Sequence, residues 1–213
     1  MLHRFALAAV GLVGLTAASI SGVQAFSSAR TGKPLYTAAF DKAEPPPGWS
    51  EFCAEHFSEC LNKARSPRSI TVTPENWLMI IDVNEHVNEQ IRPMTQAERR
   101  GRENLWSFAE DGRGDCKDYV LVKRRKLIEA GLPREALLIT IVWTPQEQGH
   151  AVLMVRTDRG DFVLDNLLPN VMLWSETNYQ FVERQSETDP NAWVYIDGGP
   201  PIGSDILLAH GLI

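Results

Sequence analysis

The sequence predicts an α+β fold in which helices pack on an antiparallel sheet, because helical patterns come first and strand patterns follow. Residues 74–91 and 115–130 repeat apolar side chains at helical spacing. From residue 136 onward the apolar residues form short, β-branched runs. The turn at residues 157–160 joins two of these runs as a hairpin, which makes the sheet antiparallel.

The chain begins with the features of an export signal. A short positive segment precedes an apolar run to about Ser19, and small residues at Val23 and Ala25 suit signal peptidase. An uncleaved membrane anchor is the alternative, but the run is short for a span of ~20 residues and contains glycines. We predict that residues 1–25 are a cleaved signal peptide, so that no stable membrane insertion remains.

The rest of the chain predicts one domain behind an irregular lead-in. Residues 26–48 are rich in small residues and end in three prolines and a glycine, which is typical of extended, irregular chain. Residues 49–213 are long enough for a single full-sized core. A net charge of −6 without a basic stripe argues against nucleic acid as a partner.

Three cysteines in an exported protein pose a pairing question. Cys53 and Cys60 lie seven positions apart, and their pairing as a disulfide would leave Cys116 as a free thiol. A small metal site from Cys53, His56 and Cys60 is the alternative, although a fourth ligand is not obvious. A disulfide to Cys116 would remove the candidate nucleophile altogether.

The first helix is predicted to start at a Thr73 cap followed by proline and to end before Pro93. Asn84 and Asn88 fall on its buried side, where we expect them to cap neighbouring backbone. Residues 95–113 are predicted to form an ordered loop, with Trp106 among its apolar anchors.

The second helix is predicted to start near Asp115 and to end at a glycine and a proline. Its basic residues are predicted to form one solvated face. They are Lys117, Lys123, Arg124, Arg125 and Lys126.

Strands are predicted at residues 136–143, 151–155 and 162–164, with a late strand at 193–196. If the hairpin closes with two or four loop residues, Arg156 faces Asp161 and Val152 faces Asp165. His150 is then a diagonal neighbour of Asp165 on the same face. A three-residue loop would place the two side chains on opposite faces.

Cys116, His150 and Asp165 follow one another in the order of a nucleophile, a base and an orienting group. A cysteine attacks as the thiolate, which the positive end of a helix dipole stabilises. Each residue alone has an ordinary structural explanation, as core thiol, strand histidine or turn aspartate. Their order and shared face favour a catalytic triad.

Several blocks of the chain form one recognisable set. They are Gly114-Asp115-Cys116-Lys117-Asp118-Tyr119, Lys123, Gly131-Leu132-Pro133, Gly149-His150-Ala151-Val152-Leu153, Leu164-Asp165-Asn166 and the Val83-Asn84-x-x-Val87-Asn88-x-x-Ile91 helix. Together these blocks, over about residues 74–170, resemble the bacterial transglutaminase-like cysteine proteinases.

The resemblance implies a papain/transglutaminase-like fold, with Cys116 as nucleophile, His150 as base, Asp165 as orienter and a periplasmic location. One branch of the family cuts a large surface adhesin and binds calcium beside the nucleophile through an Asp-Cys-Glu-Asp run. Asp115 and Asp118 match that run, but Lys117 stands at its glutamate position and is not a calcium ligand.

We therefore predict a periplasmic cysteine peptidase that acts on an exported or surface protein and requires no cofactor. Trp106 is a candidate for lining the substrate cleft, and packing in the core is its alternative. Acyl transfer to an amine and a non-catalytic binding module on the same fold are the two competing functions.

Overall fold

The computed structural model describes residues 34–61 and 63–196. They form the predicted α+β fold around a seven-stranded sheet in the order β1-β9-β8-β4-β5-β6-β7. Every neighbouring pair in this sheet is antiparallel. The strands are β1 (Ala39–Ala43), β4 (Leu137–Trp143), β5 (Gly149–Thr157), β6 (Gly160–Leu164), β7 (Met172–Leu173), β8 (Gln180–Gln185) and β9 (Trp193–Ile196).

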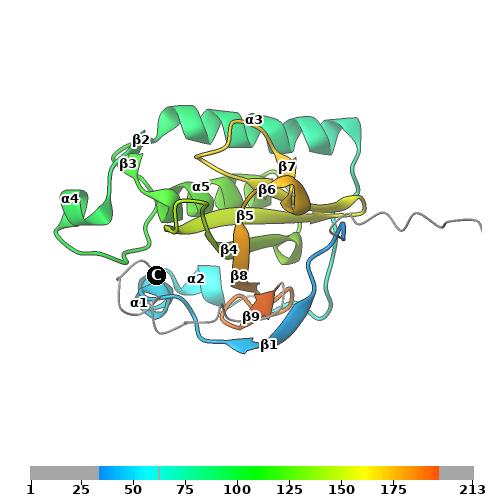
Figure 1. Cartoon of the computed structure of the whole chain (residues 1–213), viewed down its shortest axis with the longest axis horizontal. Helices are drawn as coiled ribbons and strands as arrows, with labels where there is room; N and C mark the ends of the chain where they lie inside the picture. Colours follow the sequence, from blue (N-terminus) through cyan, green and yellow to red (C-terminus); the bar gives the residue numbers. More distant parts are fainter. Residues whose placement is uncertain (1–33, 62, 197–213) are drawn as a thin grey trace, which may run out of the picture. The chain divides into compact units, whose positions relative to one another are not determined.

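Two long helices, α3 (Pro74–Gln90) and α5 (Cys116–Glu129), pack against each other, and α5 lies against β5 (Figure 1). Thr73 caps α3 by accepting a hydrogen bond from the Asn76 N–H, as the sequence predicts. The shorter elements are α1 (Trp49–Glu55), α2 (Phe57–Cys60), α4 (Gln96–Arg100) and the 3₁₀ turns η1 (Arg134–Ala136) and η2 (Trp174–Glu176). Strands β2 (Arg92–Pro93) and β3 (Arg113–Gly114) pair in parallel.

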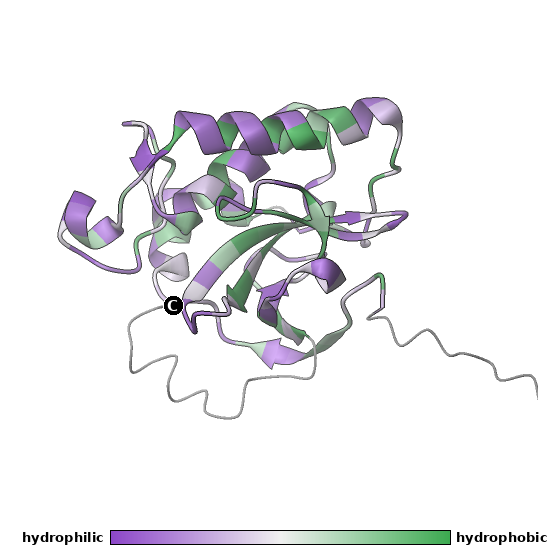
Figure 2. Ribbon diagram, turned by 45° about the horizontal axis from the view of Figure 1, so that its top comes forward, coloured by the Kyte–Doolittle hydropathy of each residue, from purple (hydrophilic) through white to green (hydrophobic). Residues whose placement is uncertain are grey.

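The central strands are buried on both faces, which explains their nearly continuous apolar sequence. Side chains that alternate along β4 and β5 contribute to two separate apolar clusters, one of which includes α5. Figure 2 shows the central strands as mainly hydrophobic and α4 as mainly hydrophilic. The core therefore fixes the sheet, and α5 with it.

The predicted solvated face of α5 is wrong at Lys123 and Arg124, and only 17% of the Lys117 side chain is exposed. Lys123 is 0% exposed and Arg124 is 2% exposed, whereas Lys126 is exposed as expected. Arg124 is held in the core by a hydrogen bond from Nε to the carbonyl oxygen of Leu137, at 3.0 Å. The sequence shows that these helix residues are positively charged. Whether each one is buried depends on how the helix packs on the sheet, which the sequence alone does not show.

Two other predictions for irregular chain also need correction. The described part of the lead-in contains β1, which pairs with β9 at the edge of the sheet. The predicted loop at residues 95–113 contains α4, which begins with a capping box between Thr95 and Glu98. That Thr-x-x-Glu spacing is visible in the sequence and could have predicted the helix.

The structure pairs Cys53 with Cys60 in a disulfide and leaves Cys116 free, as predicted. The alternative metal site is excluded, because both thiols are consumed and His56 packs its ring on Phe52 and Phe108.

Every described element belongs to one unit, Gly32–Ile213. The predicted signal peptide and the chain beyond residue 196 lie outside the described residues. Within residues 34–61 and 63–196, no helix combines the length and the apolar character needed to cross a bilayer.

Glu183 on β8 offers a test of the buried sheet. Burial raises the pKa of its carboxyl from 4.5 to about 8. Between pH 4.5 and about 8, Glu183 is therefore protonated in the folded protein and ionised in the unfolded chain. Its contribution to the unfolding free energy is fully present below pH 4.5 and is lost as the pH rises through about 8. We expect Glu183→Gln to remove this part of the pH dependence of the unfolding free energy, measured by urea denaturation.

The exposed Glu147 provides the control for this measurement, because Glu147→Gln changes the same charge outside the core. Its unfolding free energy should follow the wild-type pH dependence. If the unfolding free energies of wild type and Glu183→Gln depended on pH in the same way, the raised pKa of Glu183 would be contradicted.

Candidate active site

Cys116 is the first residue of α5, and its position is fixed by the cap of that helix. Asp115 accepts a hydrogen bond from the Lys117 N–H at 3.0 Å, and Asp118 accepts one from the Asp115 N–H at 2.9 Å. This capping box holds the first turn from both sides. The Cys116 N–H is one of the initial N–H groups that have no partner within a helix, so it is available to a bound group.

Gly114 allows the chain to approach this turn closely. A Cβ atom at Gly114 would lie 2.5 Å from Cβ of Asp118 and 2.7 Å from its Oδ2. Any side chain here would push the aspartate away from the cap. Gly114 is therefore needed for the local geometry of the cysteine.

The β5–β6 hairpin brings His150 and Asp165 together in the register that the sequence predicts for a two-residue loop. Arg156 faces Asp161 and Leu153 faces Leu164. The same register continued by one position places Val152 opposite Asp165, so that His150 is its diagonal neighbour. The side chains meet with His150 Nε2 at 2.7 Å from Asp165 Oδ1.

The ring of His150 is buried between Asp165 and Cys116. Because Nε2 is engaged by Asp165, Nδ1 is the ring nitrogen left for the thiol. Burial alone would lower the pKa of His150, but hydrogen bonds with Asp165 and Cys116 outweigh it and raise the pKa to about 10. The site therefore stabilises the imidazolium at neutral pH.

Asp165 is held by contacts that the sequence did not reveal. The Tyr179 hydroxyl donates to Oδ2, the Leu167 N–H donates to Oδ1 at 3.1 Å, and Asn88 Nδ2 donates to the Asp165 carbonyl at 2.8 Å. Burial would raise the pKa of Asp165, but the bonds from His150 and Tyr179 lower it overall. The carboxylate is thus kept ionised and in a fixed orientation.

The expectation that Asn84 and Asn88 cap neighbouring backbone is wrong. Asn88 donates to the backbone carbonyl of Asp165, 77 positions away. The amide of Asn84 is buried without a hydrogen-bond partner among the described residues. No local pattern marks Asn88 or Tyr179, because both act through contacts between distant parts of the chain.

Lys123 is fully buried, close enough to Asp165 to be affected by its charge. The Lys123 ammonium has no hydrogen-bond partner among the described residues. Burial lowers the pKa of Lys123 to about 7, against the opposing charge of Asp165. Its nearest aromatic contact is the ring of Tyr119, whose centroid lies 5.9 Å from Nζ.

Cys116 and His150 line a cleft of about 200 Å³. Trp106 lines it too, but is only 4% exposed and donates from Nε1 to the Pro47 carbonyl at 3.1 Å. Trp106 therefore combines the two expected roles, as core residue and as cleft wall. The remaining lining residues are Pro46, Pro47, Thr95, Glu103, Asn104, Asp115, Lys117, Ile141, Gly149 and Ala151.

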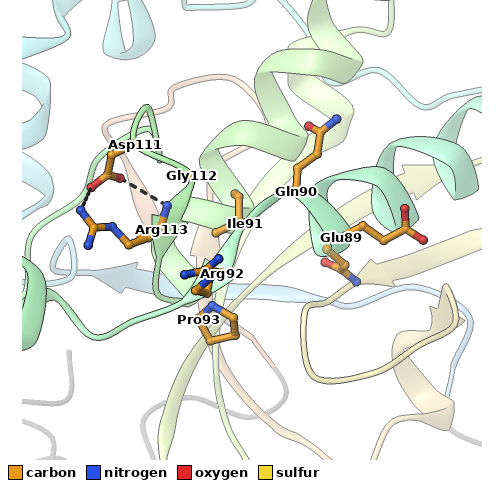
Figure 3. A pocket seen from close by; sticks show the side chains of 9 residues that line it. Glu89, Gln90, Ile91, Arg92, Pro93, Asp111, Gly112 and Arg113 are labelled. Carbon is orange, nitrogen blue, oxygen red and sulfur yellow. Dashed lines mark hydrogen bonds and ion pairs between the residues drawn. The ribbon is translucent and has the colours of Figure 1, made fainter.

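A larger hollow of about 580 Å³ lies at the end of α3 and contains Arg92, Asp111 and Arg113 (Figure 3). Neither Cys116 nor His150 lines this hollow. The smaller cleft is the candidate active site, because of the two it alone is lined by the free cysteine and its histidine partner.

Asp115 and Asp118, which match the calcium-binding run of the family branch, already have cationic partners in the structure. Lys117 Nζ lies 2.8 Å from Asp115 Oδ2, so that an ammonium occupies the place of a metal beside this carboxylate. Asp118 is fully buried and accepts hydrogen bonds from Gln96, Arg99, Ser107 and the Asp115 N–H. Among residues 34–61 and 63–196, no group of three or more histidine, cysteine or acidic side chains could hold a metal ion.

A free thiol at a helix start, beside a buried imidazole–carboxylate pair, is an arrangement typical of cysteine hydrolases. The family model described as "Bacterial transglutaminase-like cysteine proteinase BTLCP" matches residues 39–200. The chain belongs to this family and is a cysteine peptidase of the transglutaminase-like class. The resemblance seen in the sequence is confirmed.

Three solved structures of LapG from Legionella pneumophila are similar to the chain. The calcium-bound form is 22% identical and covers 62% of this chain and 78% of its own, with a TM-score of 0.48. The EGTA-treated form is 22% identical and covers 64% of this chain and 79% of its own, with a TM-score of 0.48. A third structure is 23% identical and covers 64% of this chain and 78% of its own, with a TM-score of 0.49. No curated protein sequence matches the chain.

Tyr179 provides a test of how Asp165 is held. Tyr179→Phe removes one donor that lowers the pKa of Asp165, so this pKa should rise and the carboxylate should protonate at higher pH. The measurement is the rate of Cys116 alkylation by iodoacetamide as a function of pH. We expect the fall of this rate at acid pH to begin at a higher pH in Tyr179→Phe, with rates roughly tenfold below those of the wild type in that range.

Tyr119→Phe is the matched control, because its buried hydroxyl donates to the Ile91 carbonyl at 2.6 Å, away from Asp165. Its alkylation profile should follow that of the wild type. Superimposable profiles for Tyr179→Phe and wild type would refute the role of the tyrosine.

Proposed function

We propose that the chain is a periplasmic thiol peptidase that cleaves a peptide bond with Cys116, His150 and Asp165. The observation that supports it most is the chain of contacts in one cleft, in which His150 binds Asp165 at 2.7 Å and also hydrogen-bonds Cys116. Such a pair supplies both a nucleophile and a proton donor.

In the proposed reaction, the Cys116 thiolate attacks the carbonyl carbon of the scissile peptide bond. The proton on His150 Nδ1 passes to the leaving amine as the C–N bond breaks, which gives a thioester and a free amine. His150, now neutral, takes a proton from water, which attacks the thioester. The acid product leaves, and the thiolate–imidazolium pair is restored. Asp165 holds Nε2 throughout and stabilises the charged ring.

The Cys116 N–H is the proposed donor to the oxyanion that forms on the attacked carbonyl. The neighbouring Lys117 N–H is engaged by Asp115, and the Trp106 indole N–H is engaged by Pro47. These two donors are therefore less suited to the role. The Lys117 ammonium lines the same cleft and adds positive charge near the reacting sulfur.

The proposed setting is the periplasm, and the proposed substrate is an exported or surface protein. The predicted signal at residues 1–25 and the Cys53–Cys60 disulfide both suit an oxidising compartment. The family resemblance points to a large secreted adhesin as the protein partner. The net charge of −6 argues against nucleic acid.

We also propose that the activity requires no calcium. Lys117 neutralises Asp115, and Arg99 lies 3.3 Å from Asp118. A cation bound between these carboxylates would have to displace two positive side chains, and the reaction described above draws on no metal.

The test is cleavage of an unstructured peptide library derived from exported proteins, with new N-termini located by mass spectrometry. We expect cleavage by wild type, equal in EGTA and in CaCl₂, and a loss of roughly a thousandfold or more in Cys116→Ala and in His150→Gln. His86→Gln is the control, because His86 is exposed and contacts Asp82 on the outer side of α3. A primary amine added to the reaction should not be incorporated.

Three results would overturn the proposal. Cleavage that persists in Cys116→Ala would remove the nucleophile assignment. Amine incorporation in place of new N-termini would establish acyl transfer. Absence of both reactions in folded wild type would favour the binding module.

A further inference from the structure

Arg99 on α4 is a cation buried beside the start of the nucleophile helix. Its side chain is 3% exposed. The guanidinium is bidentate to Asp111, with Nε at 3.0 Å from Oδ2 and Nη2 at 2.5 Å from Oδ1. Nη1 donates to Ser107 Oγ at 3.0 Å and to Asp118 Oδ1 at 3.3 Å.

These partners come from two parts of the site. Asp111 and Ser107 belong to the segment between α4 and β3, whose Glu103, Asn104 and Trp106 line the cleft. Asp118 belongs to the first turn of α5, two residues after Cys116. One guanidinium therefore connects a wall of the cleft to the helix that carries the thiol.

The arrangement needs a positive charge at this place. Asp111 and Asp118 both accept hydrogen bonds from the guanidinium. Arg113 is a second cation beside Asp111, with Nη2 at 3.3 Å from Oδ2 (Figure 3). Burial raises the pKa of Asp118 to about 6, against hydrogen bonds from Ser107 and Asp115 and the charge of Arg99. Without Arg99, the buried carboxylate of Asp118 would lose its cationic partner, and the link between Asp118 and Asp111 would be lost.

We propose that Arg99 is a positioning residue that serves as a built-in cation, fastening the cleft wall to the first turn of α5. The atoms around the guanidinium are all oxygens, from two carboxylates and a hydroxyl, which is the donor type preferred by hard cations such as calcium. The Arg99 side chain thus bridges these oxygens with a positive charge, as a bound ion would, but the charge is part of the chain. This inference rests on the proposed role of Cys116 as the nucleophile.

The experiment compares Arg99→Ala, Arg99→Lys and Arg102→Ala in the full mature chain. Arg102 is three positions away, is 60% exposed on its side chain and pairs with Glu51, so its loss removes the same charge from the same segment. Two quantities are measured in EGTA and in millimolar CaCl₂: the melting temperature, and the rate of Cys116 alkylation by iodoacetamide.

In EGTA we expect Arg99→Ala to melt lower than Arg102→Ala and its Cys116 to react more slowly, on the order of tenfold to a hundredfold. Arg99→Lys should fall between, since it keeps the charge but loses the bidentate contact. Calcium should raise the melting temperature of Arg99→Ala and restore most of its alkylation rate, because the oxygens are freed for the ion. Wild type and Arg102→Ala should not respond to calcium.

The proposal fails if Arg99→Ala behaves as Arg102→Ala in EGTA, or if calcium affects wild type and Arg99→Ala equally. It also fails if Arg99→Ala remains unfolded or unreactive in calcium, since a purely structural defect would not respond to an ion. Both readouts are taken without a peptide substrate. Their failure is therefore distinct from failure of the proposed peptidase function, which is measured by cleavage.

Discussion

The hydrogen bond between His150 and Asp165 is the contact on which the rest of the site depends. It joins the start of β5 to the end of β6, so its 2.7 Å length requires the hairpin register to be correct. It also selects the ring nitrogen that faces the thiol and favours the imidazolium. Both strands are buried in the sheet. A shift of the β5–β6 register by one residue would therefore separate His150 from Asp165 and would also turn apolar core side chains toward solvent.

Much of this site follows from the sequence, because its determinants are local. The cap at Asp115 places Cys116 at a helix start, and the two-residue hairpin loop places His150 diagonally to Asp165. The α+β class follows from the change of apolar period along the chain. What local pattern could not reveal is burial and distant contact: Lys123 is in the core, and Tyr179 and Asn88 bind Asp165.

The acidic residues near the thiol illustrate the same limit. From the sequence alone, Lys117 could be seen to place a positive charge between Asp115 and Asp118. The structure adds Arg99, which comes from α4 and lies against Asp118. Two positive side chains, Lys117 and Arg99, thus lie beside the carboxylates of Asp115 and Asp118 at the start of α5.

The central claim is that the His150 ring beside Cys116 is protonated at neutral pH, and an NMR titration of this ring tests it most directly. Nitrogen-15 shifts of His150 would be followed from pH 5 to 11 in wild type and in Cys116→Ala. A pKa of about 10 in wild type, and a lower one without the thiol, is the predicted result. A ring that is already neutral at pH 7.5, or one unaffected by Cys116→Ala, would contradict the account.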